Sequence, residues 1–329
     1  MAYQNVGTPR FYINVYEWAN TIGINVTSYP PLNPIYNTLP VNPVPFWDFT
    51  SDTSSINLQD LQDYVPSSEN PSGTYDDESN INTHPCFVAI LGHDFTDMIY
   101  THGQVNSVGI VNGDPSSGYK GFTIYRTKEL VHKVFLDSGG TGNAGSVIIG
   151  VVYDMPHSPD LALTMTREMD GVKKIRTKGG ADLVYHKYIK PAMWGGAGAW
   201  ELYESDADPN YQSMARSGRR IWDLSFSYLQ ESDVFPMLSS LTPFESTSDS
   251  DEVYSDNTDW HEGETLLDDN TFYNQVIHKT NGGQLPFVFQ PNKNDNTNFA
   301  ICKFDQSSFK FDQVANGVYN CKMKIREVW

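Results

Sequence analysis

The sequence contains little cysteine. Only Cys86, Cys302 and Cys321 occur among its 329 residues. Their spacing lacks the closely spaced ligand pairs of a zinc site, and their odd number does not suit a disulfide framework. The first residues lack a basic segment followed by an apolar one, so we predict no cleaved signal peptide. We therefore expect reduced thiols and a protein that is made and assembled in a cytoplasm.

Positive charge is scarce as well. The chain has 22 Lys and Arg residues against 40 Asp and Glu residues, and its net charge is −18. An acidic surface repels phosphate backbones, which argues against nucleic acid as the main partner. Long apolar runs are missing too, since no stretch approaches the roughly 20 residues of a membrane-spanning helix. We expect no membrane insertion.

The motifs of common active sites are also missing. The sequence has no G-x-S-x-G elbow, no H-E-x-x-H motif and no cysteine in a recognisable nucleophile setting. Gly140, Gly142 and Gly145 match G-x-G-x-x-G, but a strand-like run follows them where a dinucleotide site needs a helix. We interpret these glycines as a hairpin turn. No catalytic or cofactor-binding residue is predicted, and the chain is expected not to be an enzyme.

Two stretches invite a metal hypothesis. The insert at residues 232–270 holds ten acids between residues 245 and 270, yet it lacks the spacing and central glycine of an EF-hand. His84, His93 and His102 are nine residues apart, a spacing that favours neither a strand face nor a helix turn. We interpret the insert as a solvated acidic loop, with calcium binding as the alternative, and predict no metal ligands.

Aromatic residues are abundant, with 17 Phe, 19 Tyr and 7 Trp. Flat rings suit the pleated, half-buried surface of a strand. After residue 85, the runs CFVAILG, GFTIYR and SVIIGVVYDM read as strands separated by Gly and Ser clusters. The expected fold class is mainly β, with an antiparallel, jelly-roll-like β-sandwich module, a C-terminal β-rich domain and little helix.

Two segments near the C-terminus alternate with period two. In RRIWDLSFSYL, one face carries Trp222, Leu224, Phe226 and Tyr228. The run VYNCKMKIREV alternates in the same way, and both patterns favour antiparallel sheets with one wet face. If residues 300–304 pair with this last run, Cys302 and Cys321 could be close to each other and still reduced.

The pattern divides the chain into residues 1–84, 85–165 and 166–329. Residues 29–46 carry six prolines, which donate no backbone hydrogen bond and favour an extended arm over an inner strand. The apolar side chains of this arm would then be buried on a neighbouring copy, so its deletion should weaken oligomers. The predicted interface residues are Leu32, Ile35, Tyr36, Phe46, Trp47, Arg216, Arg219 and Arg220.

Basic residues gather in two places, residues 167–178 and residues 216–220. In an acidic chain, such clusters can bind an acidic neighbour and set its register. If identical copies pack head to tail, the acidic insert of one copy would face these bases in the next. Ordinary solvated strand faces are the alternative, because exposed ion pairs contribute little.

The last third of the chain has a recognisable order of segments. RSGRRIWDLSFSYL has the form R-x-W-x-L-x-F, and FYNQVIHKTNGGQLPFVF, FAICKFDQSSFKFDQV and GVYNCKMKIREVW follow it. This order resembles the C-terminal β-domain of minor and distal tail proteins of tailed bacteriophages. In that family, a strand, a short helix, a glycine turn with P-F-x-F and closing strands recur. The matching positions are Arg220, Trp222, Leu224, Phe226, Phe272, Gly283, Pro286, Phe287, Phe289, Phe304, Tyr319, Ile325, Glu327 and Val328.

The resemblance implies a virion structural protein that forms a homo-oligomeric ring in the tail tip or baseplate and binds other tail proteins. It covers about a third of the chain, and the long acidic insert departs from the family's short link. Residues 85–165 resemble a galactose-binding-like jelly roll in CFVAILGHDF and SVIIGVVYDM, which implies a rigid spacer or a module for host surface glycans. The alternatives are a virion-surface carbohydrate-binding module and a head–tail connector or tail terminator component. The expected location is the virion tail.

Overall fold

The computed structural model describes part of the chain. The described residues are 6–23, 28–29, 47–49, 54–57, 81–91, 99–102, 107–111, 122–129, 133–136, 142–144, 146–168, 172–186, 193–194, 197–198, 219–235, 270–295 and 298–328. Over these residues the fold is mainly β, which confirms the predicted class. Every pairing between described strands is antiparallel.

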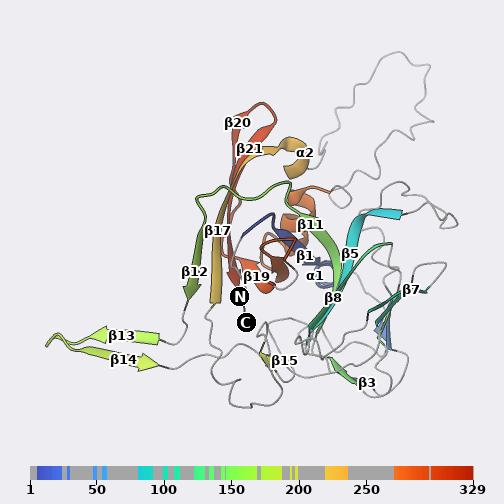
Figure 1. Cartoon of the computed structure of the whole chain (residues 1–329), viewed down its shortest axis with the longest axis horizontal. Helices are drawn as coiled ribbons and strands as arrows, with labels where there is room; N and C mark the ends of the chain where they lie inside the picture. The colour runs from blue at the N-terminus through green and yellow to red at the C-terminus, as the bar shows by residue number, and fades with distance from the viewer. Residues whose placement is uncertain are drawn as a thin grey trace.

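A ten-stranded sheet forms the body of the molecule (Figure 1). Its spatial order is β12 (Thr164–Glu168), β17 (Arg219–Gln230), β21 (Val318–Glu327), β19 (Ala300–Phe304), β18 (Phe287–Gln290), β1 (Arg10–Asn14), β11 (Ser146–Asp154), β5 (Ile81–Leu91) and β8 (Phe122–Glu129). The tenth strand, β20 (Phe311–Ala315), pairs with β21 outside this path. Because β1 pairs with both β11 and β18, strands from all three expected regions share one sheet.

The remaining strands form smaller sheets. A five-stranded sheet has the order β2 (Ser28–Tyr29), β4 (Ser54–Asn57), β9 (Lys133–Leu136), β6 (Ile99–His102) and β7 (Ser107–Val111). The two-stranded sheets are β3 (Trp47–Phe49) with β10 (Gly142–Ala144), β13 (Val172–Arg176) with β14 (Asp182–His186), and β15 (Met193–Trp194) with β16 (Ala197–Gly198). The strands of residues 85–165 are thus divided among several sheets, and the jelly-roll topology stays a prediction.

The N-terminal aromatic segment changes from strand to helix at Asn14. β1 leads directly into α1 (Val15–Thr21), and the Asn14 side chain accepts a hydrogen bond of 3.2 Å from the backbone N–H of Glu17. This contact caps one of the free N–H groups at the start of the helix. The chain passes so close to β11 here that a Cβ on Gly150 would lie 1.9 Å from the carbonyl oxygen of Ile13. Glycine at this position therefore allows the bend.

Both faces of the central strands are buried. One face carries a large cluster that α1 and the short helix η5 (Tyr273–Ile277) cover, and the opposite face carries a smaller cluster. Central members of the large cluster are Phe11, Ile13, Trp222, Phe226, Phe272, Phe287, Phe289 and Phe304. The smaller cluster consists of Tyr12, Phe87, Ala89, Ile148, Val152, Val288 and Ile301. Burial on both sides explains why β18 is apolar at consecutive positions instead of alternating.

Strand β17 confirms the predicted alternation for most of its length. Trp222, Leu224 and Phe226 are buried on one face. The predicted place of Tyr228 on that face is wrong, because its side chain is 74% exposed. The pairing of β17 with β21 shifts between Phe226 and Leu229, and Tyr228 has φ of 62°. A bulge of this kind adds one residue to a strand, so Leu229 takes the core position.

The pairing of the last strands is confirmed, but the two thiols lie apart. Cys302 on β19 is opposite Glu327 on β21, whereas Cys321 is opposite Phe226 on β17. Six residues of β21 separate these positions, roughly 20 Å at the rise of an extended strand. The expected closeness of the two thiols is therefore wrong, because adjacency of strands does not fix their register. Both thiols are free and buried, and burial raises the pKa of Cys321 to about 12.

The G-x-G-x-x-G motif was expected to form a hairpin turn, but its middle glycine lies in a strand. Gly142 begins β10 and pairs with Phe49 of β3, so it lies in a strand. The following run forms β11, which confirms that a strand and not a helix follows the motif. Gly140 and Gly145 lie outside the described residues.

Candidate functional site

The predicted interface residues fall partly within the described chain. Trp47 lies in β3 opposite Ala144, and Arg220 lies in β17 opposite Arg167 of β12. Arg219 is the neighbouring residue of β17. The structure thus brings together members of the two basic clusters. The predicted interface residues outside the described part are Leu32, Ile35, Tyr36, Phe46 and Arg216.

Arg220 forms a buried ion pair within its own chain. Its Nη2 donates to Oε1 of Glu327 at 3.0 Å, and both its Nε and its backbone N–H donate to Oε2. Its Nη1 donates to Oδ1 of Asn298 at 2.7 Å, and its Nη2 also donates to the carbonyl oxygen of Phe299 at 2.6 Å. The two charged side chains are 12% and 5% exposed. This arginine therefore joins β17 to β21 and to the segment before β19.

The R-x-W-x-L-x-F pattern has a clear packing basis. Side chains two residues apart on a strand share a face, which places Arg220 beside Trp222. The guanidinium carbon lies 5.2 Å from the centroid of the Trp222 ring, and this ring meets the Phe289 ring edge-on at 5.2 Å. Such cation–π and aromatic contacts add to the stabilisation from apolar burial. Burial and the charge of Arg220 lower the pKa of Arg167, which Glu327 partly offsets.

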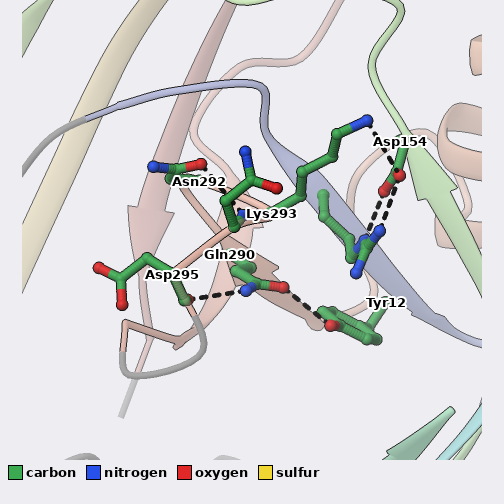
Figure 2. A network of polar contacts seen from close by, with 8 residues as sticks. Tyr12, Asp154, Gln290, Asn292, Lys293 and Asp295 are labelled. Carbon is green, nitrogen blue, oxygen red and sulfur yellow. Dashed lines mark hydrogen bonds and ion pairs between the residues drawn. The ribbon is translucent and has the colours of Figure 1, made fainter.

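A second network joins three distant segments at the end of the central strands. The Tyr12 hydroxyl donates to Oε1 of Gln290 at 2.8 Å, and Nε2 of Gln290 donates to the carbonyl oxygen of Asp295 at 2.8 Å (Figure 2). Gln290 is fully buried, so these bonds satisfy an amide that would otherwise be costly to bury. The loop after β18 is thereby held against β1.

The same network contains a charged pair. Arg10 binds Asp154 through both Nε and Nη2, the latter at 2.8 Å, and the Lys293 ammonium lies 3.5 Å from the same carboxylate (Figure 2). Asp154 is the last residue of β11, and Arg10 is the first residue of β1. The bidentate geometry fixes the register of these two strands. Both cations contact the same carboxylate, which indicates a structural clamp.

Buried ionisable groups also lie around α1. Glu17 is 3% exposed, and burial raises its pKa to about 7, with Lys303 and Asn14 opposing the shift. The His278 ring meets the Trp18 ring edge-on at 5.5 Å, and burial followed by the Lys279 charge lowers the pKa of His278. Lys279 is fully buried and donates to Oε1 of Gln275 at 2.8 Å. Glu17 and Lys279 are thus buried, whereas the His278 side chain is only partly buried.

Two further properties concern the described residues. They contain no group of three or more His, Cys, Asp or Glu side chains that could hold a metal ion. The helices among them include none that is long and apolar enough to cross a membrane. The described networks of Arg10 and Arg220 join strands of the large sheet.

Comparison with known proteins gave no relatives. No family model, no curated protein and no solved structure matches the chain.

Sequence reasoning missed the clamp residues Arg10, Asp154 and Gln290. They are ordinary polar residues at strand ends, and only the pairing of β1 with β11 and β18 makes them neighbours. The family pattern did contain a signal for Arg220 and Glu327, because both are among its matching positions. It carried no information that the two would pair.

Proposed function

We propose that this chain is a non-enzymatic structural protein of a bacteriophage tail, a minor or distal tail component that forms a homo-oligomeric ring at the tail tip. The order of elements supports this proposal. β17, η5, the short helix η6 (His278–Thr280), a glycine turn and β18, β19 and β21 follow one another as in the family.

The observation that carries the proposal is that the matching positions pack together. They come from distant strands, yet most belong to a single buried cluster on one face of the sheet. The matching positions within the cluster are Trp222, Leu224, Phe226, Phe272, Phe287, Phe289, Phe304 and Ile325.

The glycine of the pattern is also structurally required. Gly283 has φ of 88°, a conformation that side chains disfavour, and a Cβ on it would lie 2.8 Å from the Cβ of Phe304. Its N–H donates to Oγ1 of Thr280 at 3.0 Å, which closes the turn after η6. The turn thus delivers the chain from the helix into β18, as the pattern requires.

The proposal is tested on virus particles. Virus particles are prepared from a bacterial culture infected with the phage that encodes this chain. They are labelled with a gold-tagged antibody against the chain and imaged by electron microscopy. Label at the distal end of the tail is the expected result. Label at the head–tail junction would show that the chain is a head–tail connector or tail terminator component instead of a tail-tip component. Absence of the chain from the particles, checked by mass spectrometry, would overturn the proposal.

A second measurement distinguishes the tail-tip ring component from the alternative, a carbohydrate-binding module. The purified chain is applied to an array of bacterial surface polysaccharides. A tail-tip ring component should show no glycan preference. Specific retention together with label along the outer particle surface would favour the binding module instead.

A further inference from the structure

The hairpin of β13 and β14 stands apart from the sheets. In Figure 1 it projects sideways from the body beyond β12. Among the described strands, β13 and β14 pair only with each other. A two-stranded hairpin without a covering layer is marginally stable in water.

The tip of this hairpin is nevertheless well defined. The backbone N–H of Thr177 donates to the carbonyl oxygen of Ala181 at 2.8 Å, and the Thr177 hydroxyl donates to the same oxygen at 3.0 Å. The N–H of Ala181 donates back to the Thr177 hydroxyl at 3.1 Å, and Gly180 has φ of 83°. The hairpin therefore has a hydrogen-bonded turn.

The two faces of the hairpin differ. Ile175 and Leu183 are directly opposite each other and share one face, and each is 61% exposed. The other face carries Lys174, whose ammonium lies 2.7 Å from the carboxylate of Asp182. Apolar side chains contribute to stability only when they are covered, and nothing in the described part of the chain covers this pair.

The charge of the hairpin is opposite to that of the whole protein. Residues 172–186 carry four cations and one carboxylate, in a chain whose net charge is −18. Arg176 and Lys178 are exposed and form no ion pair with any described residue. A basic, partly apolar hairpin is therefore complementary in charge to a second copy of this acidic chain. Contacts between two copies that do not include the hairpin are disfavoured, because both copies are otherwise acidic.

We propose that the hairpin of residues 172–186 docks on a second copy of this chain, with Ile175 and Leu183 buried in the contact, while the net positive charge of the hairpin favours its approach to that acidic copy. This inference rests on the proposed function in one respect, that identical copies pack against each other. What it adds is that the hairpin is the element that makes the contact. Repeated from copy to copy, a contact of this head-to-tail kind closes a ring or extends a filament.

The test compares two double variants of the full chain. In I175T/L183T the hairpin loses its apolar pair but carries β-branched threonine, which suits a strand, at both positions. In the control L161T/V314T, two other exposed apolar residues are changed to threonine. Sedimentation velocity over a range of concentrations measures self-association. We expect the dissociation constant of the hairpin variant to rise at least about tenfold and that of the control to stay at the wild-type value. Near-ultraviolet circular dichroism of both variants should match the wild type, because neither pair lies in a core cluster.

Charge gives a second readout. Self-association of the wild type should weaken as sodium chloride is raised, and K174E/R176E should weaken it at low salt. A hairpin variant that associates like the wild type overturns the inference and leaves the tail assignment intact. A wild type that stays monomeric, or a hairpin that binds only nucleic acid, also overturns it. Absence of the chain from virus particles overturns the tail assignment alone, because the hairpin contact would still be measured in solution.

Discussion

At the scale of single residues, charged side chains at strand ends fix which strands meet. Arg220 with Glu327 and Arg10 with Asp154 each join two strands of the large sheet. Bidentate arginine pairs have one favourable geometry, so they select a register as well as adding energy. Their value depends on burial, because solvent screens exposed pairs.

The pair of Arg220 and Glu327 leads to a first prediction. Glu327→Ala should lower the free energy of unfolding by roughly 3–5 kcal/mol, because it leaves a buried guanidinium without its counter-charge. Asp312→Ala is the matched control, since it removes the partner of Lys310 from a pair that is 80% and 57% exposed. That change should cost less than about 1 kcal/mol. Urea denaturation measures both, and similar losses in the two variants would contradict the structural role of Arg220.

Glu17 gives a prediction about pH. Because burial raises its pKa from 4.5 to about 7, the folded state holds the proton more tightly than the unfolded chain does. Its contribution to stability is therefore complete below about pH 4.5 and is lost as the pH rises through 7. Glu17→Gln should remove this loss, so the variant should exceed the wild type in stability at pH 8, by an amount on the order of 3 kcal/mol.

The measurement for Glu17 is the difference in unfolding free energy between variant and wild type at several pH values. This difference should grow between pH 4.5 and pH 7 and then level off. The same substitution at the exposed Glu231 serves as the control for replacing a carboxyl group by an amide. A flat difference for Glu17→Gln would show that its carboxyl titrates normally.

At the scale of elements, the bend from β1 into α1 decides how the helix covers the sheet. The close approach of Ile13 and Val15 to β11 is possible only where β11 has no side chain. α1 then places Trp18 and Ala19 on the large core cluster. One glycine in a strand of branched residues thus sets the position of a helix.

Gly150→Ala adds only one methyl group, yet it should clearly lower the stability of the fold. The added Cβ would overlap the carbonyl oxygen of Ile13, and a backbone contact cannot move aside as a side chain can. We expect a loss of at least about 1–3 kcal/mol. Gly179→Ala, in the hairpin tip with no atom within 4 Å of the added Cβ, should be close to neutral. Thermal unfolding compares the two, and equal melting temperatures would contradict the close approach.

At the scale of the whole molecule, β1 unites the parts of the chain. It lies between β11 and β18, so the N-terminal, middle and C-terminal regions share one sheet. The Phe11 ring lies 5.5 Å from the Phe287 ring and 5.3 Å from the Phe289 ring, between centroids. Removal of β1 would expose one edge of β18 and open the large cluster.

We predict that a fragment of residues 166–329 does not fold by itself, although its pattern reads as a domain. The full chain without residues 29–46 retains β1 and should keep the sheet, which makes it the control. Amide chemical-shift dispersion in nuclear magnetic resonance spectra measures folding in both. A well-dispersed spectrum of the fragment would show that β1 is dispensable.

The antiparallel, mainly β class and the main strands were predictable because alternation of apolar and polar residues is a local property. The patterns around Trp222 and Met323 identify β17 and β21 and their buried faces. The place of Tyr228 was not predictable, since a bulge depends on how the partner strand pairs. The separation of Cys302 from Cys321 was missed for the same reason. Of the predicted interface, Arg220 proved to be paired inside its own chain.

What the sequence by itself determined are the properties that depend on neighbours along the chain: strand periodicity, the charge of −18 and the glycine turn before β18. Only the tertiary structure decided which strands are adjacent, that β1 lies at the centre of the sheet, and that the hairpin of residues 172–186 leaves an apolar pair uncovered. The physical reason is that register and burial arise from contacts between residues far apart in sequence, and alternation is the same for every partner that a strand could choose.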